Sequence, residues 1–509
     1  MATGTPTRED DPRPERGSSS PTGSPAGAVT PRQRAGAPRG GPDGRTTGPG
    51  TGPGAEGAAG LRARIAGHAR RHRVFLGLLL AAVAARVTMI VAYPSALKYL
   101  GDSAAYLDQA TNGLWPGDWR PSGYPMFLIV TGGRTHLTWL TVVQHLLTLL
   151  AAVALYAAAC RALRRPWLAA LAAAPALLHP WVLDLGHFVL ADSLFGTLVA
   201  LGVALLALLP SASSPSTSSP SAPPPSASAP PGSRSGTPPA GGPGRRRAAM
   251  LCCAAAGLLL GASLTVRTVG YGPLAVGLVG LVGILLAERA RSPRRPARPG
   301  ARPGVRPALA LAGAFALAAA VPVVSYSAWS ASRGGDFSVS AHSGFFLYGR
   351  VAPFADCSVL SSDELRTLCD PRPVEERGAP VTYLWPDDSL LRQGNDDVPP
   401  GREELAGEFA REVILAQPGM MISTSARYLA GYFLPVRYET RLTSRADTWE
   451  MPTEPTNRLP ADHPHTHDGY FVADELRDPP AGALAAYSRL SYAPMPLVGL
   501  GLLAGVAAW

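Results

Sequence analysis

Charge is scarce in this sequence, and one kind of charged residue is almost missing. Only 16% of the 509 residues are charged, and Lys98 is the only lysine. Hydrophobic residues make up 46% of the chain, while its 55 glycines and 52 prolines make up about a fifth. So much glycine and proline does not fit into one ordinary globular domain together with so much apolar surface. This disfavours a single soluble enzyme domain and a fibrous repeat protein, and the arginine excess suggests a GC-rich bacterial genome.

Cysteine is also scarce, with five in the chain. Cys160, Cys252 and Cys253 lie in or beside long apolar runs, where cysteine serves as a small apolar side chain. Cys357 and Cys369 fall in an acidic segment that the charge pattern places outside the cytoplasm, where a disulfide can form. Such a disulfide is worth about 2–4 kcal/mol. A metal-binding or redox pair is the alternative, which the spacing disfavours because it is not CxxC.

Long apolar runs dominate the region 74–329, the predicted membrane domain, and one more follows at the C-terminus. A bilayer core is about 30 Å thick, which about 20 helical residues cross. Eight runs approach or exceed that length: 74–93, 137–160, 167–183, 187–209, 248–266, 270–287, 307–329 and 494–509. Pro175 and Pro180 interrupt the third run, and 125–131 is too short to span. Buried helices of a soluble protein could explain any one run but hardly all eight. We predict an all-α polytopic membrane bundle with about eight spans.

Arginine clusters orient these spans. They precede the first run and follow the second, fourth and sixth, which places the N-terminus in the cytoplasm. The tail 1–73 and the linker 210–247 are rich in small residues and proline, and are predicted to be disordered and cytoplasmic. The segment 330–484 has 24 acidic residues against 14 arginines, or about −10. We expect a small mixed extracytoplasmic domain there, followed by the C-terminal membrane segment 485–509. This sidedness favours a multi-pass cell-membrane protein in a lipid bilayer and disfavours nucleic-acid binding.

The first external loop, 94–136, holds the most informative polar residues. Asp102 opens a short helical pattern with Tyr106 on the same face. Arg120 and Tyr124 follow in the segment Arg-Pro-Ser-Gly-Tyr-Pro. Asp102 has two interpretations, a helix N-cap or a catalytic carboxylate at the membrane surface, and the residues alone favour the cap.

This layout resembles the GT-C class of membrane glycosyltransferases. The nearest type depends on a lipid carrier and includes protein O-mannosyltransferases and aminoarabinose transferases. The resemblance rests on a carboxylate after the first span, a D-x-x-x-Y helix and an R-P-x-G-Y-P segment, all within 99–127. Its layout covers about 74–330, and nothing in 330–484 matches the class. The resemblance implies a polyprenyl-phosphate-linked sugar donor, transfer on the external face, and Asp102 as the base acting on the acceptor. With the resemblance included, the catalytic interpretation of Asp102 is favoured over the helix N-cap.

Three more residues fit parts of that chemistry. Arg267 lies between two spans, and an arginine matches phosphate geometry. The resemblance implies that Arg267 holds the donor phosphate, while contact with lipid headgroups is an equally supported alternative. The resemblance also implies a second carboxylate in an early external loop, which binds a divalent metal or the acceptor. Asp184 fits that place loosely, and Asp192 lies deeper, where an unpaired charge is costly.

A separate metal candidate lies near the end of the acidic segment. His463, His465 and His467 alternate, which places three imidazoles on one side of an extended chain and could bind zinc. A plain polar loop is the simpler interpretation. A divalent metal is thus the only cofactor that the sequence suggests.

We therefore expect a glycosyltransferase that moves a sugar from a polyprenyl-phosphate carrier to an extracytoplasmic acceptor: an envelope glycan, a lipid or a protein. A membrane transporter or lipid flippase is one alternative, but it predicts inverted repeats, and no convincing repeat is visible. A non-catalytic envelope assembly protein is the other, with the acidic segment as its binding module.

Overall fold

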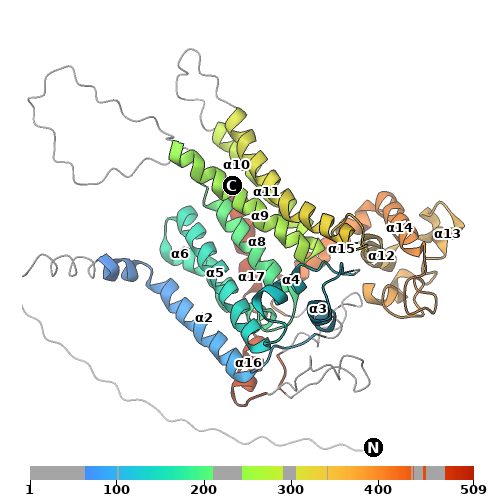
Figure 1. The fold of residues 1–509 in the computed structure, drawn as a ribbon, viewed down its shortest axis with the longest axis horizontal. Coiled ribbons are helices and arrows are strands. Elements are labelled where there is room, and N and C mark those ends of the chain that lie inside the picture. The colour runs from blue at the N-terminus through green and yellow to red at the C-terminus, as the bar shows by residue number, and fades with distance from the viewer. Residues whose placement is uncertain are drawn as a thin grey trace, which may run out of the picture. The chain divides into compact units, whose positions relative to one another are not determined.

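The computed structural model divides the chain into residues 1–63 and 64–509. It describes residues 64–99, 102–117, 119–209, 243–290, 305–340, 342–436, 440, 451–453 and 476–508. Most of the tail 1–73, most of the linker 210–247 and the three histidines of the metal candidate lie outside this part. The described residues are mostly helical and include no strand (Figure 1).

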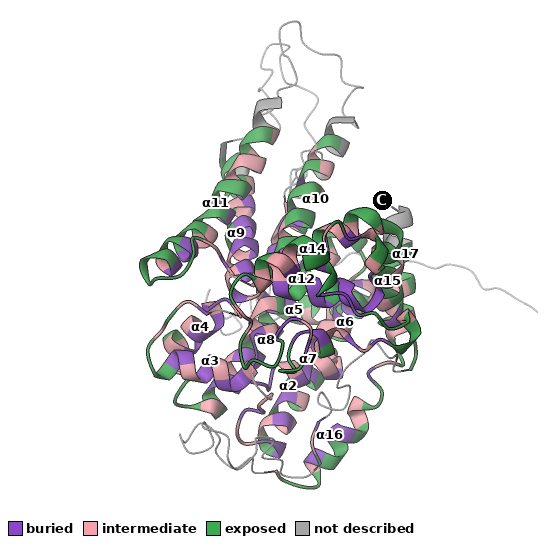
Figure 2. Cartoon of the chain, turned by 90° about the vertical axis from the view of Figure 1, so that its right-hand side faces the viewer, coloured by how far each residue is buried: buried purple, intermediate pink, exposed green. Residues whose placement is uncertain are grey.

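Four of the described helices are long and apolar enough to cross a membrane: α2 (Arg73–Ala92), α5 (Leu137–Leu163), α9 (Pro243–Val266) and α11 (Val305–Ser332). Their apolar side chains remain largely exposed, and α11 is coloured mainly as exposed and intermediate in Figure 2. Leu317 on α11 is 74% exposed and Leu80 on α2 is 71% exposed. Water would disfavour such surfaces, whereas lipid would cover them. The helices are therefore consistent with a protein in a lipid bilayer.

Four other apolar helices coincide with the remaining predicted runs: α6 (Pro166–Leu178), α8 (Ala191–Ala207), α10 (Tyr271–Ala290) and α17 (Met495–Ala508). The predicted run 167–183 is divided by Pro180, which begins the short helix α7 (Pro180–Leu185). Proline is favoured at the first helical position, where its missing N–H costs nothing. His179 caps this helix, since its side chain accepts a hydrogen bond from the backbone N–H of Trp181.

Two glycines explain how closely α9 and α11 pack. A Cβ at Gly257 would overlap the carbonyl oxygen of Phe315, and a Cβ at Gly261 would overlap that of Ala319. Glycines four residues apart lie on one helix face and let two membrane helices approach closely. The side-by-side course of α9 and α11 in Figure 1 follows from this pair.

Helix extends beyond two predicted boundaries. Residues 64–71 are helical, although the sequence analysis assigns them to a disordered tail that ends at residue 73. Likewise, α9 begins at Pro243, inside the predicted disordered linker 210–247. Alanine and arginine are good helix formers, so a helix continues out of an apolar run into its basic flank.

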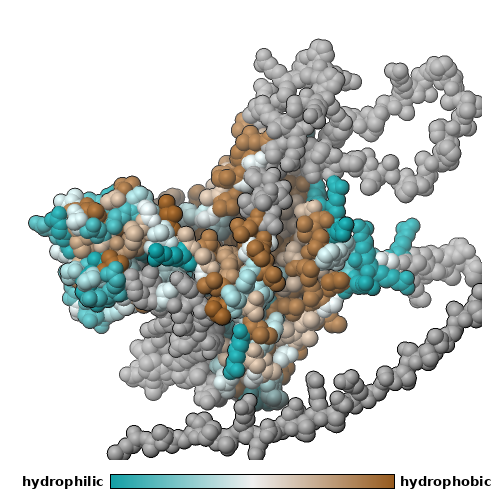
Figure 3. Space-filling model, turned by 180° about the vertical axis from the view of Figure 1, so that it is seen from behind, coloured by the Kyte–Doolittle hydropathy of each residue, from teal (hydrophilic) through white to brown (hydrophobic). Residues whose placement is uncertain are grey.

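The described part of the acidic segment 330–484, which we expect to be a small mixed domain, consists of helices and turns and includes no strand. It contains α12 (Ser343–Val351), α13 (Asp363–Arg366), α14 (Arg402–Ala416), α15 (Pro418–Gly431) and short 3-10 turns. The first of these helices packs on α14 around Phe345, Tyr348 and Phe409, each fully buried. The surface of this part is mainly hydrophilic, in contrast to the brown apolar surface of the long helices (Figure 3).

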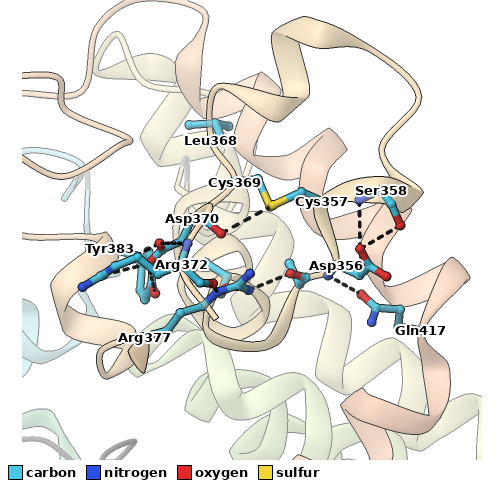
Figure 4. The surroundings of a disulfide bond; sticks show 12 residues. Asp356, Cys357, Ser358, Leu368, Cys369, Asp370, Arg372, Arg377, Tyr383 and Gln417 are labelled. Carbon is cyan, nitrogen blue, oxygen red and sulfur yellow. Dashed lines mark hydrogen bonds and ion pairs between the residues drawn. A yellow bond between two sulfur atoms is a disulfide. The ribbon is translucent and has the colours of Figure 1, made fainter. Parts of the chain in front are cut away.

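A disulfide joins Cys357 to Cys369 in this segment, as Figure 4 shows. Next to it, the carboxylate of Asp370 accepts hydrogen bonds from Arg372 and Tyr383. These donors hold the pKa of Asp370 well below its usual range. Arg377 in turn donates to the backbone carbonyl of Ala355 at 2.6 Å. Covalent and polar links therefore fix a stretch that has little regular secondary structure.

Candidate active site

Two ion pairs form the candidate site. Asp102 is the first residue of α3 (Asp102–Thr111) and pairs with Arg120, which lies in the turn before α4 (Gly123–Thr131). Asp192, in the first turn of α8, pairs with Arg267, which follows the last residue of α9. An acidic side chain in the first turn of a helix is favoured by the helix dipole. The position of Asp102 and Asp192 in the first turn of a helix therefore favours the charged form of both side chains.

Electrostatics shows that the two pairs are neighbours. The charges of Arg120, Arg267 and Asp192 all act on the carboxyl group of Asp102. The same charges, together with that of Asp102, act on the phenol of Tyr106. Four charged side chains from three separate regions of the chain therefore meet around one tyrosine. Their formal charges cancel.

The four charged side chains of this cluster are partly buried but still reachable from solvent. The side chains of Asp102 and Arg120 are 23% and 26% exposed, and those of Asp192 and Arg267 are 29% and 36% exposed. Burial raises the pKa of Asp102 above its ordinary value, and the nearby Arg120 and Arg267 oppose that rise. A carboxylate in this setting is a stronger base than one in water, and a ligand can still reach it.

A close backbone approach holds the two arginines near each other. A Cβ at Gly123 would overlap the backbone carbonyl of Thr265, two residues before Arg267. Only glycine allows the start of α4 to lie so close to the end of α9. This is the glycine of the R-P-x-G-Y-P segment, so that motif brings Arg120 towards Arg267.

Ser122, fully buried, fixes the same turn. Its hydroxyl donates to the carbonyl of Trp115 and accepts from the backbone N–H of Gly117, both at 2.9 Å. Its own N–H donates to the hydroxyl of Tyr326 on α11, also at 2.9 Å. The turn that carries Arg120 is therefore tied to the long apolar helix α11.

The wall behind the cluster is aromatic. Tyr106 is 4% exposed and packs edge to face on Tyr124 with ring centroids 5.0 Å apart. The hydroxyl of Tyr124 donates to the side-chain carbonyl of Gln144 on α5 at 2.9 Å. The amide of Gln144 then donates to the carbonyls of Gly186 and Phe188. Tyr106 and Tyr124, the two tyrosines predicted from the sequence, therefore pack against each other behind the ion pairs.

Asp184 lies in another neighbourhood. It is 2% exposed, and its charge acts on Tyr93, which follows α2. Of the two candidates for a second carboxylate, the structure therefore places only Asp192 among the charges around Asp102.

Arg86 lies within α2, where a charge facing lipid would be costly. Its guanidinium faces inward and donates to the carbonyl of Leu177 at 2.7 Å and to Thr148 at 3.3 Å.

Metal binding has limited support among the described residues. No group of three His, Cys, Asp or Glu side chains in this part is arranged to hold a metal ion. The candidates His463, His465 and His467 lie outside it. A divalent ion at the ion-pair cluster would have Asp102 and Asp192 as its protein ligands and would need others from a substrate.

A contact that sequence reasoning missed links the first loop to the acidic segment. The indole of Trp119 stacks on the imidazole of His342, with ring centroids 3.9 Å apart, and contacts Phe345 and Trp385. Nδ1 of His342 pairs with Glu403 on α14. The only signal in the sequence is a tryptophan next to the motif arginine, and no spacing rule relates residues 119 and 342.

Comparison of the chain with protein-family models, curated proteins and solved structures found no match.

Proposed function

We propose that the chain is an integral-membrane glycosyltransferase of the GT-C type. It would transfer a sugar from a polyprenyl-phosphate carrier to an extracytoplasmic acceptor, namely an envelope glycan, a lipid or a protein. The observation that supports this most is the meeting of Asp102 and Arg120 with Asp192 and Arg267 in one partly exposed cluster. In this proposal the eight apolar helices make about eight spans, the N-terminus is cytoplasmic, and the segment 330–484 lies outside.

The proposed reaction assigns one role to each side of the cluster. The oxygen of the acceptor hydroxyl attacks the anomeric carbon, and the bond from that carbon to the phosphate oxygen breaks. The hydroxyl proton passes to Asp102, whose raised pKa suits a general base. The electron pair of the broken bond stays on polyprenyl phosphate, and Arg267 stabilises the charge that develops there. Arg120 lies next to the base and adds positive charge on the donor side.

Breaking the ion pairs to admit such a donor costs little free energy. Pairs between partly exposed side chains contribute only about 0–1 kcal/mol. A phosphate accepts two parallel hydrogen bonds from one guanidinium and competes well with a carboxylate for it. Donor binding therefore replaces Asp192 at Arg267, so the negative phosphate enters beside a cation that is already in place.

The deciding experiment compares two aspartates of one helix. Asp102→Asn keeps the size of the side chain but removes the base, and transfer should fall by about 10²–10⁴-fold. Asp108→Asn is the matched control, because Asp108 lies on α3 outside the cluster and pairs with Asn112. Transfer is measured as polyprenyl phosphate released from a panel of polyprenyl-phosphate sugars by the full chain in vesicles, with an envelope extract as acceptor.

Two outcomes would contradict the proposal. Equal transfer by Asp102→Asn and the unmodified protein would remove Asp102 as the base. An absence of donor cleavage with every sugar and acceptor would favour a transporter or an assembly protein, for which Asp102→Asn should matter little. Membrane insertion and the thermal midpoint of each variant show whether the fold is kept.

A further inference from the structure

One stretch of the acidic segment 330–484 has no acidic residue. The segment contains 24 Asp and Glu in total, yet none lies between Glu412 and Glu439. The charged residues of this stretch, 413–438, are two arginines. Its composition therefore departs from the water-facing character of the surrounding segment.

Helix α15 lies in this stretch and contributes little to the core. Its only buried residue is Gly431, whereas the preceding α14 buries Ala406, Phe409, Ala410 and Val413. On α15 the large apolar side chains face outward, with Ile422 at 68% and Leu429 at 62% exposed. They are seven residues apart and share one helix face. Arg427 lies on the opposite face.

The apolar surface continues past the end of the helix. Tyr432 is 55% exposed, Leu434 is 38% exposed and Val436 is 64% exposed. Isolated exposed apolar residues are ordinary in proteins, but a contiguous group marks a contact surface. We call Ile422, Leu429, Tyr432, Leu434 and Val436 the α15 surface.

The α15 surface adjoins an apolar helix of the bundle. The ring of Phe433 lies against Gly499 of α17, so close that a Cβ there would be 3.1 Å from it. Leu497 and Leu503 of α17 are 72% and 68% exposed. Exposed apolar residues therefore lie on α15 and on α17, and Phe433 joins the end of α15 to α17.

Aromatic rings gather where the two helices meet. Trp181 packs edge to face on Tyr432 and on Tyr492, with ring centroids 6.4 and 5.2 Å apart. Tryptophan and tyrosine are enriched at the level of lipid headgroups, because their rings are apolar and their N–H and O–H groups are polar. This group marks the depth at which the bundle would leave the hydrocarbon.

A cavity of about 430 Å³ lies beside the same helix. Phe354, Met421 and Leu429 give it apolar walls, and Arg350 and Ser425 are among its polar residues. Within the described residues the guanidinium of Arg350 has no hydrogen bond or ion pair. An apolar cavity beside an exposed arginine that has no ion-pair partner among the described residues fits a ligand with an anionic head and an apolar chain.

We propose that the α15 surface is a membrane-contact surface that lies in the headgroup region of a phospholipid bilayer, and that the cavity with Arg350 holds one phospholipid. The apolar face of Ile422 and Leu429 enters the lipid, while Arg427 faces water and headgroups. The phosphate of the bound lipid lies at Arg350, and part of an acyl chain lies against Phe354 and Met421. The proposal rests on the membrane helices and not on glycosyl transfer.

Spin labels on one helix test the membrane contact. Single cysteines at Ile422 and Leu429 are compared with one at Arg427, in the full chain with Cys160, Cys252 and Cys253 replaced by alanine and the disulfide kept. Each variant is labelled with a nitroxide in vesicles of phosphatidylcholine and phosphatidylglycerol. Labels at 422 and 429 should collide more often with oxygen, which concentrates in lipid, than with a water-soluble nickel chelate. The label at 427 should show the reverse.

Two results would overturn the membrane contact. Frequent collision with the nickel chelate at 422 and 429 would mean that the surface faces water. Slow collision with both reagents at these sites would mean that protein covers the surface, as in a complex with a second copy. The label at Arg427 serves as an internal standard in both cases, because it lies on the same helix but on the opposite face.

The bound lipid has its own test. The full chain, extracted in mild detergent and exchanged into phosphatidylglycerol, should retain one phospholipid in native mass spectrometry. Arg350→Gln should lower the retained fraction at least about tenfold, the factor that corresponds to 1.4 kcal/mol. Arg427→Gln should leave it unchanged, since Arg427 does not line the cavity. Equal retention by Arg350→Gln and the unmodified protein would overturn the lipid assignment of the cavity.

Discussion

A methyl group at Gly123 should separate the two halves of the ion-pair cluster. A Cβ at this position would overlap the carbonyl oxygen and carbon of Thr265, and would lie 3.1 Å from the Thr265 hydroxyl. The overlapped atoms belong to the backbone, so no side-chain rotation can relieve the overlap. The start of α4 must instead move away from the end of α9, and Arg120 must move away from Arg267.

The cost of Gly123→Ala follows from these contacts. Overpacking of a tight site costs about 1–3 kcal/mol. The movement also strains the hydrogen bonds of Ser122 to Trp115, Gly117 and Tyr326, each worth about 1 kcal/mol. We therefore expect a loss of about 2–4 kcal/mol, towards the upper end if those bonds break. In a domain of 150–250 residues each kcal/mol shifts the thermal midpoint by about 2–4 °C, and a larger chain shifts less.

The assay compares thermal midpoints and donor cleavage for Gly123→Ala and Gly280→Ala in the same detergent. Gly280 lies on α10, and nothing lies within 4 Å of a Cβ built there. Its replacement should leave the midpoint unchanged or raise it slightly, because alanine favours the helix. Equal midpoints and equal cleavage for the two variants would refute the close approach of α4 to α9.

Two other predictions concern pH and redox state. Because burial raises the pKa of Asp102, the pH–rate profile of donor cleavage should have its acid limb above the ordinary aspartate value. Arg120→Gln removes a positive charge that lowers the pKa of Asp102, so the acid limb of the profile should move to higher pH. An acid limb at the same pH in this variant would show that the limb does not report the titration of Asp102. A raised carboxyl pKa also means that the folded state binds the proton more tightly, so the contribution of Asp102 to stability increases as the pH falls. Separately, the Cys357→Ser/Cys369→Ser double variant should lower the free energy of unfolding by about 2–4 kcal/mol, which is measured as faster proteolysis of residues 343–416. A reducing agent should speed this proteolysis in the unmodified protein and should have no further effect on the double variant.

The sequence was most informative where a single pattern decides the local structure. Apolar helices lie at all eight predicted runs, because long apolar stretches favour a helix in any apolar setting, although the prolines of 167–183 divide that run between α6 and α7. Boundaries were less certain. The start of α9 at Pro243 extends into the predicted linker, since helix propensity continues through the arginines after the apolar run has ended.

The site was only partly accessible to sequence reasoning. The first-loop motif contains Asp102 and Arg120, and the structure shows that these two residues form a pair. The choice between Asp184 and Asp192 could not be made from order along the chain, because it depends on how α7 and α8 turn relative to α9. The roles of Gly123 and Gln144 were also missed. Gly123 belongs to the R-P-x-G-Y-P motif and Gln144 to no motif, but the contact of each, with Thr265 and with the carbonyl of Phe188, appears only in the fold.

The neutral pairing of the cluster constrains the proposed mechanism. Each arginine is paired with a carboxylate, and a polyprenyl-phosphate sugar brings one additional negative charge as a phosphodiester. If the guanidinium groups turn towards that phosphate, Asp102 loses the interactions with Arg120 and Arg267 that lower its pKa, while the burial that raises it remains. Donor binding should then make Asp102 a stronger base at the moment when the acceptor must be deprotonated. The acid limb of the pH profile should accordingly lie at higher pH for the donor-bound protein than for the free protein, and a limb at the same pH in both would show that the arginines do not leave Asp102.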